Sequence, residues 1–347
     1  MRTRLIVAAA ILLAAIVAVF GPGLLGDYFT RILLLICMNG VLVASLGLCN
    51  GFTGVFSLGH VGFVATAAYV NGILSLTAEQ SASLLPNLPA WLSGWGMHFL
   101  PATLIAGLVT AALAALVGLP LMRLSGHFVS VATMGFLIIV NGVLVNADEF
   151  TRGSRTFTGV PLDTTLPWAM GWLVITLLVL ARIIYSPIGR AMRAVRDNAI
   201  AARGIGINVL RTRLLAFVVG AFFAGVGGSL YARYLGSFSP ATFYFSMMIN
   251  QIAMLVLGGM GSLSGAMIGV VVIGTMTELL RALERGFSID GVTMPPLFGA
   301  SQIALGLVFI LIMIYRPTGI AGGREIVLWP RTSTRPAPSV EEAPSRN

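Results

Sequence analysis

Long apolar stretches without a charged residue alternate with short polar segments along most of the chain. Stretches of this kind cover residues 5–26, 32–78, 80–122, 234–277 and 291–315. Each of them exceeds the roughly 20 mostly apolar residues that one transmembrane helix needs. The pattern therefore predicts an all-α, polytopic integral membrane protein that lies in a lipid bilayer.

About ten transmembrane helices are expected, with glycine-rich segments that break some of them. The predicted spans are 5–20, 30–50, 53–77, 99–122, 127–146, 166–186, 213–235, 245–259, 262–282 and 298–315. The region 245–282 is either two spans or one long broken helix, because its central glycines can form a turn or a break. Residues 5–20 resemble a signal peptide, but no small-residue cleavage site follows, so we interpret them as the first helix.

The distribution of arginine orients these helices, because cytoplasmic loops of membrane proteins are rich in Lys and Arg. Residues 182–213 contain seven Arg and one acid, which places this loop in the cytoplasm. Arginines at both ends of the chain indicate cytoplasmic N- and C-termini, and an even number of helices satisfies this. We expect a transmembrane domain over residues 1–322 and a disordered cytoplasmic tail over 323–347, which is poor in apolar residues.

Composition narrows the possible functions. Apolar residues make up 57% of the 347 residues and charged residues 10%, against about 25% charged in a soluble domain, which excludes soluble classes. All 21 basic residues are Arg, and the absence of Lys excludes a Walker A P-loop and a pyridoxal Schiff base. The arginines do not form a soluble basic domain, so the net charge of +9 does not indicate a nucleic-acid partner.

The sequence offers no catalytic constellation and no metal site. Cys37 and Cys49 would lie about 18 Å apart on one helix, which is too far for a disulfide, and we interpret them as free, buried thiols. His60, His98 and His127 lack the spacing of metal ligands. No catalytic residue and no bound metal are therefore predicted.

The cytoplasmic loop 187–213 has the most regular pattern outside the membrane. Pro187 is typical of a helix start, and Arg193 and Asp197 are spaced for an ion pair on the surface of that helix. Apolar residues recur at near-helical spacing on another face. They are Ile188, Met192, Val195 and Ala199.

A second short helix is expected over residues 199–203. Asn198 can cap its start, Gly204 or Gly206 can end it, and Asn208 can cap the next membrane helix. Two interpretations remain open on these grounds. The loop either lies on anionic lipid headgroups as an amphipathic helix, or it presents a small alanine face to a cytoplasmic partner.

Residues 47–62 contain five glycines, which are costly in a helix. Broken backbone inside a membrane must be buried in protein or line a cavity, and transporters often build substrate sites from such segments. The alternative is close helix packing through small residues. The residues that would line a translocation pathway are Asn50, Thr53, Ser57, Gly59 and His60.

Gly261, Gly265 and Gly269 repeat every four residues, which is typical of a packed helix pair. With Gly258 and Gly259 they are interpreted as helix-packing positions, and a flexible hinge is the functional alternative. The other intramembrane polar residues are neutral, so a proton relay or an ion-coupled carrier has little support.

Four segments together carry a specific combination: GFTGVFSLGH at 51–60, RAVRDNAIAARGIGIN at 193–208, LGGMGSLSG at 257–265 and YRPTG at 315–319. On these segments, the chain resembles over residues 30–322 the larger, M-type permease subunit of the branched-chain amino acid (Liv) ABC importers. The resemblance implies a transport subunit in the bacterial inner membrane that moves branched-chain or other hydrophobic amino acids into the cytoplasm by alternating access, and not an enzyme.

The resemblance also implies partners. These are a periplasmic solute-binding protein, a second, shorter permease subunit and two cytoplasmic ATPase subunits that use ATP and magnesium, while this chain binds no cofactor. Ile200 stands where many ABC permeases have Glu, so no role of that acid is carried over. The residues implied to dock on the ATPase are Arg193, Arg196, Asp197, Ile200, Ala201, Ala202, Gly206 and Ile207.

Three other functions compete with this one. Permeases for urea or short amides look very similar, and no residue here separates them from amino acid permeases. An autonomous secondary carrier or channel would need a charged or ion-binding site in the membrane and would leave the loop 187–213 unexplained. A membrane enzyme would need an acid–base or metal set that the sequence lacks.

Overall fold

The computed structural model describes residues 2–284, 288–289, 292–293, 299–316 and 319–321. This part of the chain is almost entirely helical, and its sheet is a two-residue antiparallel pair of β1 (Ser288–Ile289) and β2 (Val292–Thr293). The predicted helical class is confirmed in this main feature. The tail expected at 323–347 lies outside the described residues.

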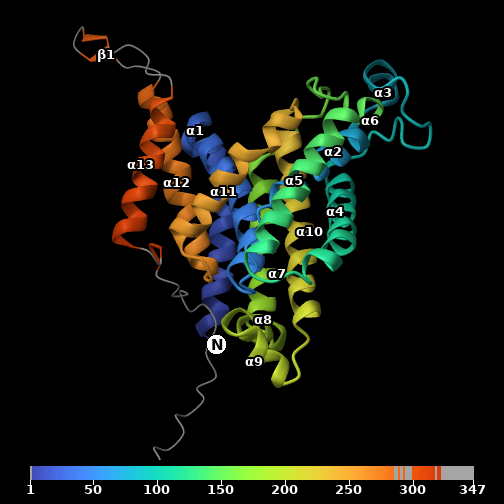
Figure 1. Cartoon of the computed structure of the whole chain (residues 1–347). Coiled ribbons are helices and arrows are strands. Elements are labelled where there is room, and N and C mark those ends of the chain that lie inside the picture. Colours follow the sequence, from blue (N-terminus) through green and yellow to red (C-terminus); the bar gives the residue numbers. More distant parts are fainter. Residues whose placement is uncertain (1, 285–287, 290–291, 294–298, 317–318, 322–347) are drawn as a thin grey trace, which may run out of the picture.

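Figure 1 shows the helices as one bundle, with α8 and α9 at its lower end and α3 and α6 at its upper end. These ends are called the α8–α9 end and the α3–α6 end below. The long helices are α1 (Arg2–Asn50), α2 (His60–Ser75), α4 (Phe99–Leu121), α5 (His127–Asn146), α7 (Leu166–Ile184), α10 (Val209–Leu235), α11 (Phe245–Gly258), α12 (Leu263–Glu284) and α13 (Ala300–Tyr315). The short ones are α3 (Ala78–Leu84), α6 (Asp148–Thr151), α8 (Pro187–Asp197), α9 (Ala199–Gly204) and the 3-10 helix η1 (Pro240–Phe243).

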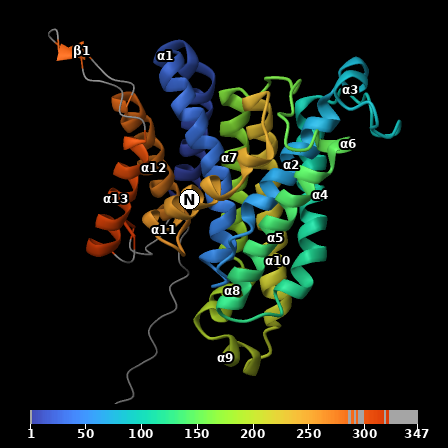
Figure 2. The same cartoon turned by 45° about the horizontal axis from the view of Figure 1, so that its top comes forward.

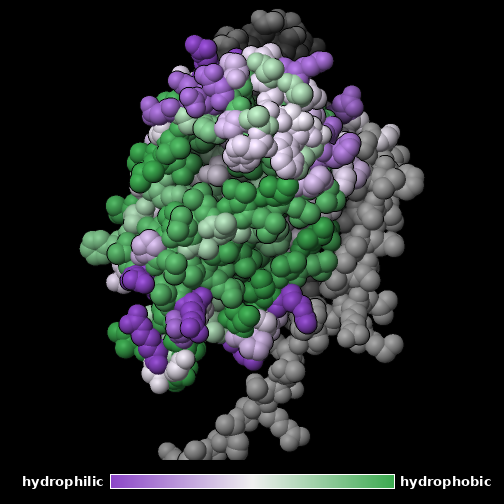
Figure 3. Space-filling model, turned by 90° about the vertical axis from the view of Figure 1, so that its right-hand side faces the viewer, coloured by the Kyte–Doolittle hydropathy of each residue, from purple (hydrophilic) through white to green (hydrophobic). Residues whose placement is uncertain are grey.

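Among the described residues, seven helical segments are long and apolar enough to cross a membrane: Gly26–Asn50, Phe99–Leu121, His127–Asn146, Leu166–Ile184, Val209–Leu235, Pro240–Gly258 and Leu263–Arg281. The space-filling view in Figure 3 shows a broad apolar belt between more polar ends. A surface of this kind matches a hydrocarbon layer bordered by water on both sides. The chain is therefore a multi-pass membrane protein.

Helix α10 lies in the middle of the bundle and packs on α1, α2 and α4. A Cβ atom on Gly225 would lie 2.2 Å from the hydroxyl of Thr110 in α4, and one on Gly228 would lie 2.3 Å from the carbonyl oxygen of Val64 in α2. Close approach through small residues is a main source of helix association in lipid. Figures 1 and 2 both place α12 and α13 on one side of α1, and α4 and α5 on the other.

The N-terminal spans differ in detail from the prediction. Helix α1 continues through the expected break between 20 and 30, but Gly26 has non-helical backbone angles (φ 74°, ψ 165°) that divide α1 into two arms. Cys37 and Cys49 lie in the second arm, and both are free and buried as predicted. The span predicted over 53–77 starts later, because the chain becomes helical again only at His60.

The region 245–282 forms two helices, α11 and α12, which pack against each other. Gly259 and Gly261, with φ angles of 118° and 94°, make the turn between them. A Cβ atom on Gly269 would lie 1.9 Å from the Met254 carbonyl oxygen, and one on Gly258 would lie 2.1 Å from that of Gly265. These contacts are those of an antiparallel hairpin whose helices approach closely because these positions carry no side chain.

Candidate functional site

Side-chain caps fix the local structure of the loop between α7 and α10. The hydroxyl of Ser186 accepts a hydrogen bond from Ile188 N (3.2 Å) at the start of α8. Asn198 Oδ1 accepts from two backbone N–H groups at the start of α9, each at 3.0 Å, and Asn208 Oδ1 accepts from Arg211 N (3.0 Å) at the start of α10. Both predicted asparagine caps and the two-helix organisation of this loop are confirmed.

The inner face of the loop is held against the bundle by apolar contacts. Met192 is fully buried among residues of α7, α10 and the second arm of α1, while Val195 and Ala202 pack with Val209 at the start of α10. The predicted stripe is therefore only partly buried, since Ile188 is 44% exposed. Burial of both helices on the bundle favours a fixed orientation of the loop over a loose surface helix.

The exposed face of the loop differs from the expectation. Ala202 is 2% exposed and points into the bundle, so the pair Ala201–Ala202 does not form one outward face. Ile200 and Ile205 are instead 81% and 76% exposed, and Ala201 between them is also exposed. We call Ile200, Ala201 and Ile205 the docking patch. Gly206 is exposed and Ile207 half-buried beside this patch.

The predicted ion pair between Arg193 and Asp197 is wrong. Arg193 Nη1 instead donates a hydrogen bond to the carbonyl oxygen of Ile184 (3.0 Å), in the last turn of α7. The last carbonyl oxygens of a helix have no hydrogen-bond donor within that helix. Ile184 O is therefore available to accept a hydrogen bond from Arg193, in place of the Asp197 carboxylate. Asp197 is paired with its neighbour Arg196, whose Nε lies 3.0 Å from Asp197 Oδ1.

Arg196 joins the loop to the two glycine-rich segments. Its Nη1 donates to the carbonyl oxygen of Gly51 (3.2 Å), and its side chain fills the space beside Gly54, where a Cβ atom would lie 2.9 Å from Arg196 Cγ. The turn between α11 and α12 completes this contact, since a Cβ on Gly51 would lie 2.6 Å from Gly261 N. We call Gly51, Gly54, Arg196 and Gly261 the Arg196 junction.

The segment 51–59 between α1 and α2 is a closed loop. Asn50 Oδ1 accepts from Ser57 N (2.9 Å), and Asn50 Nδ2 donates to Ser57 O (3.3 Å). The hydroxyl of Thr53 donates to Cys49 O (2.7 Å). On its other side the loop contacts α5, because Leu58 N donates to the hydroxyl of Thr133 (3.0 Å). The loop thus links the Arg196 junction to α5.

The remaining predicted pathway residues are also buried. A Cβ atom on Gly59 would lie 2.4 Å from Thr133 O, so the two backbones touch. His60 Nε2 lies 3.0 Å from the hydroxyl of Ser45, and this hydroxyl also lies 2.8 Å from Leu42 O. The imidazole is therefore held in a buried polar contact with α1. Ser57 differs from the other four, because its hydroxyl is buried and has no hydrogen-bond partner among the described residues.

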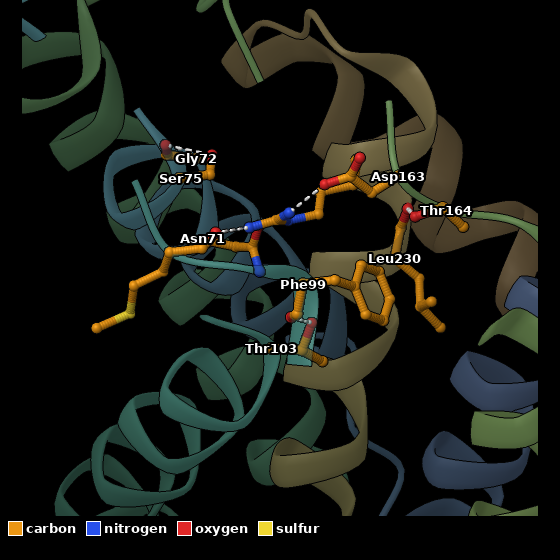
Figure 4. A network of polar contacts seen from close by, with 10 residues as sticks. Asn71, Gly72, Ser75, Phe99, Thr103, Asp163, Thr164 and Leu230 are labelled. Atoms are coloured by element: carbon orange, nitrogen blue, oxygen red, sulfur yellow. Dashed lines mark hydrogen bonds and ion pairs between the residues drawn. The ribbon is translucent and has the colours of Figure 1, made fainter. Parts of the chain in front are cut away.

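Sequence reasoning missed Arg233, which lies near the α3–α6 end of α10. Its side chain is fully buried and makes three hydrogen bonds: Nε to Asn71 Oδ1 (2.9 Å), Nη1 to Asp163 Oδ2 (2.7 Å) and Nη2 to Met97 O (2.8 Å). Figure 4 shows this network. An Arg that borders an apolar stretch normally reaches toward lipid headgroups, so its position in the sequence gave no sign of burial.

Comparison with known proteins adds to this geometry. A profile for the family described as "Branched-chain amino acid transport system / permease component" matches residues 28–315. The high-affinity branched-chain amino acid transport system permease protein LivM of Salmonella typhimurium is 29% identical, over 81% of this chain and 67% of that protein.

Two further relatives widen the range of similarity. The corresponding permease protein LivH of Escherichia coli is 34% identical over 53% of this chain and 55% of that protein. The probable LivM of Methanocaldococcus jannaschii is 22% identical over 88% of this chain and 96% of that protein. No solved structure matches the chain significantly. The similarity therefore extends over nearly the whole described bundle and includes both permease types, LivM and LivH.

Proposed function

The chain belongs to the family of branched-chain amino acid permease components, and we propose that it is a membrane permease subunit of an ATP-driven ABC importer for branched-chain or other hydrophobic amino acids. The similarity to LivM over 81% of the chain supports this function, as does the multi-pass bundle of apolar helices. In this role the chain provides a route across the membrane and couples it to an external motor. It carries out no chemical reaction itself.

The proposed topology has ten membrane crossings. It adds the first arm of α1, α2 and α13 to the seven segments that are long and apolar enough to span. The α8–α9 end, which carries the arginine-rich loop 182–213, is assigned to the cytoplasm by the positive-inside rule. The α3–α6 end, with exposed acids such as Glu79 and Glu149, then faces the outside of the bacterial inner membrane, and both termini lie in the cytoplasm.

The energy for transport must come from partner subunits. The chain contains no Lys and so cannot form a Walker A P-loop, whose lysine contacts the nucleotide phosphates. We therefore assign ATP and magnesium to two cytoplasmic ATPase subunits and no cofactor to this chain. The relatives include two permease types, which supports pairing with a second, shorter permease. A periplasmic binding protein would deliver the solute.

The docking patch carries the assignment of the ATPase contact. Ile200 and Ile205 are large apolar side chains exposed at the arginine-rich end of the bundle, and α9 holds them in place by the Asn198 cap. Exposed apolar groups with a polar surround are typical of protein interfaces. The border of this interface would be formed by Arg196, Asp197, Gly206 and Ile207. Arg193 and Ala202 instead hold the loop against the bundle on its inner face.

The Arg196 junction gives the docking loop a route into the bundle. A displacement of α8 would shift Gly51 through the Arg196 hydrogen bond, and it would shift the α11–α12 turn through the contact with Gly261. The closed loop 51–59 would transmit this displacement to α2, which begins directly after the loop, and to α5, whose Thr133 the loop contacts. We propose that Asn50, Thr53, Ser57, Gly59 and His60 change their contacts during transport and form part of the pathway in another conformation.

Co-purification tests this function. The tagged chain is extracted from its native membrane in a mild detergent, and the proteins that elute with it are identified. We expect a P-loop ATPase and a second permease, and the associated binding protein should bind leucine in preference to urea. Recovery of the chain alone, under conditions that preserve a control ABC complex, would favour an autonomous carrier or channel. Preference for urea would assign the chain to the urea and amide permeases.

A further inference from the structure

Arg233 joins separate parts of the chain at the α3–α6 end. Its three hydrogen bonds reach Asn71 near the end of α2, Met97 just before α4, and Asp163 in the segment that precedes α7. The guanidinium also lies 5.7 Å from the ring centre of Phe99, in the first turn of α4. One side chain of α10 therefore contacts three other segments that are not adjacent in sequence (Figure 4).

Further hydrogen bonds join these segments to the end of α10 and to the residues just after it. Residues 157 and 238 form an antiparallel bridge, with N–O distances of 2.7 and 3.0 Å, and the hydroxyl of Thr164 donates to Leu230 O of α10 (2.9 Å). Met97 N donates to Leu74 O of α2 (2.9 Å). We call residues 94–97 and 157–164 with the last turn of α2 the outer rim. Arg233 is where the parts of this rim meet.

The opposite end of α10 begins at the docking loop. Val209, the first residue of α10, packs on Val195 and Ala202 of the loop, and Asn208 caps the helix directly after it. Helix α10 is continuous over its 27 residues, and Val209 and Arg233 lie about 36 Å apart along it at 1.5 Å per residue. A displacement of the docking loop along or around α10 is therefore carried to Arg233.

Because Arg233 is charged, its contacts with the separate rim segments should form and break together. A buried guanidinium is stable only while its hydrogen-bond acceptors and counter-charge are in place, so the rim segments cannot leave it one at a time at low cost. The Asp163 side chain is 49% exposed while that of Arg233 is fully buried, so the pair is open to water on one side only. Such an arrangement favours two states, with the rim attached to α10 or released from it.

We propose that Arg233 is a positioning residue for transport. Together with the Thr164–Leu230 bond it attaches the outer rim to α10, and among the described residues it alone adds the end of α2 and Met97 to that attachment through charged hydrogen bonds, so that the rim follows α10 when the docking loop moves. This inference rests on the proposed function and adds to it the means by which an event at the cytoplasmic end changes access at the outer end. A role in folding alone is the alternative that an experiment must separate.

The experiment uses the whole complex reconstituted in liposomes, with Arg233→Gln, Arg233→Lys and Asp163→Asn. The control is Arg155→Gln, which changes an exposed Arg next to the same rim segment. Uptake and ATP hydrolysis are measured per assembled complex. We expect Arg233→Gln to lower uptake by at least about 10-fold while ATP hydrolysis stays within about 2-fold. Arg233→Lys should retain part of the uptake, and the control should behave as the unsubstituted complex.

A labelling measurement reports on the rim itself. Leu162 is 71% exposed in the rim and the two natural cysteines of this chain are buried, so Leu162→Cys gives this chain one accessible thiol, and its labelling is read on the separated chain. Its rate of reaction with a membrane-impermeant maleimide should differ between the nucleotide-free and ATP-bound complexes. Arg233→Gln should abolish this difference, while Arg155→Gln should leave it unchanged.

Each outcome decides for or against the inference. Normal uptake and normal nucleotide-dependent labelling in Arg233→Gln would overturn it. If Arg233→Gln fails to assemble, Arg233→Lys and Asp163→Asn decide: uptake that falls only in proportion to the amount of complex would show a folding role and overturn the inference. Absence of ATP-driven uptake by the unsubstituted complex would overturn the proposed function, and with it this inference, before any variant is compared.

Discussion

Arg196 Nη1 lies 3.2 Å from the carbonyl oxygen of Gly51, a residue 145 positions earlier in the chain. This bond connects the loop that we assign to ATPase docking with the loop that precedes α2. Gly54 and Gly261 allow the contact because neither has a side chain that would occupy the space of the guanidinium arm. In the function proposed above, the coupling of docking to transport would therefore depend on one side chain and three glycines.

Removing this hydrogen bond should lower the rate of uptake strongly and the free energy of unfolding only slightly. Arg196 is 35% exposed, so Arg196→Gln should lower the free energy of unfolding by only about 1 kcal/mol. Uptake should fall by about 10-fold, which corresponds to a coupling free energy of about 1.4 kcal/mol. Uptake per ATP hydrolysed measures this effect. Arg190→Gln, which changes an exposed Arg on the same helix, is the control, and an equal loss in both variants would contradict a specific role of Arg196.

Charge in the docking patch should prevent ATPase association. Ile200→Arg and Ile205→Arg change side chains that are largely exposed, so the amount of inserted protein should remain normal. A charge that is buried without a partner costs about 3–5 kcal/mol, which lowers the affinity for the ATPase by about 100-fold or more, so little ATPase should co-purify.

Ile200→Leu is the matched control for this prediction, because it keeps the apolar surface and should retain the ATPase. Full ATPase recovery with both arginine variants would place the docking surface elsewhere. Ala202→Arg is unsuited to this test, since Ala202 is buried against Val195 and Val209, and an Arg there would disturb the loop itself.

Close packing between α11 and α12 should be sensitive to a single methyl group. A Cβ atom on Gly269 would lie 1.9 Å from Met254 O, so Gly269→Ala should cost about 1–3 kcal/mol through overpacking. Gly135→Ala in α5 adds the same methyl group where nothing lies within 4 Å, and it should leave stability unchanged or raise it slightly. Thermal unfolding in detergent compares the two; similar midpoints would contradict the packing described.

Ser57 allows the pathway role to be separated from loop structure. Its buried hydroxyl makes no hydrogen bond among the described residues, so Ser57→Ala should leave the free energy of unfolding within about 0.5 kcal/mol. If the hydroxyl binds solute or water during transport, uptake should still fall by several-fold. Asn50→Ala, in contrast, removes both bonds that close the loop and should lower stability as well. Unchanged uptake in Ser57→Ala at normal expression would remove Ser57 from the pathway.

Local chemistry made much of this fold predictable. The asparagine caps at 198 and 208 could be predicted from the sequence, because a cap bonds backbone groups only two or three residues away. The long apolar windows were readable because lipid selects composition over a whole span. The first residue of α2 could not be predicted in the same way, since its late start depends on the bond by which Asn50 closes the loop at Ser57.

The contacts that Arg196 and Arg233 make with other segments of the chain are long-range. Arg196 reaches Gly51 and Arg233 reaches Asn71 across 145 and 162 positions, and no periodicity in one sequence records such pairs. The incorrect Arg193–Asp197 pair has a different origin, since the acceptor that Arg193 uses is only nine positions away. Spacing of four residues favoured it, but the free carbonyl of Ile184 on α7 offered Arg193 a better acceptor. The three glycine and arginine segments were thus identified separately, while their meeting at the Arg196 junction required the structure.

ATP-driven uptake of leucine by the assembled complex separates an ABC permease subunit from an autonomous carrier. The chain is reconstituted in liposomes with its co-purified permease and ATPase subunits, and radiolabelled leucine is supplied together with the binding protein. We expect uptake that requires both the binding protein and ATP on the docking-loop side, and that Ile200→Arg abolishes. Leucine uptake by the chain alone, without ATP or an ATPase, would contradict this expectation and identify an autonomous carrier.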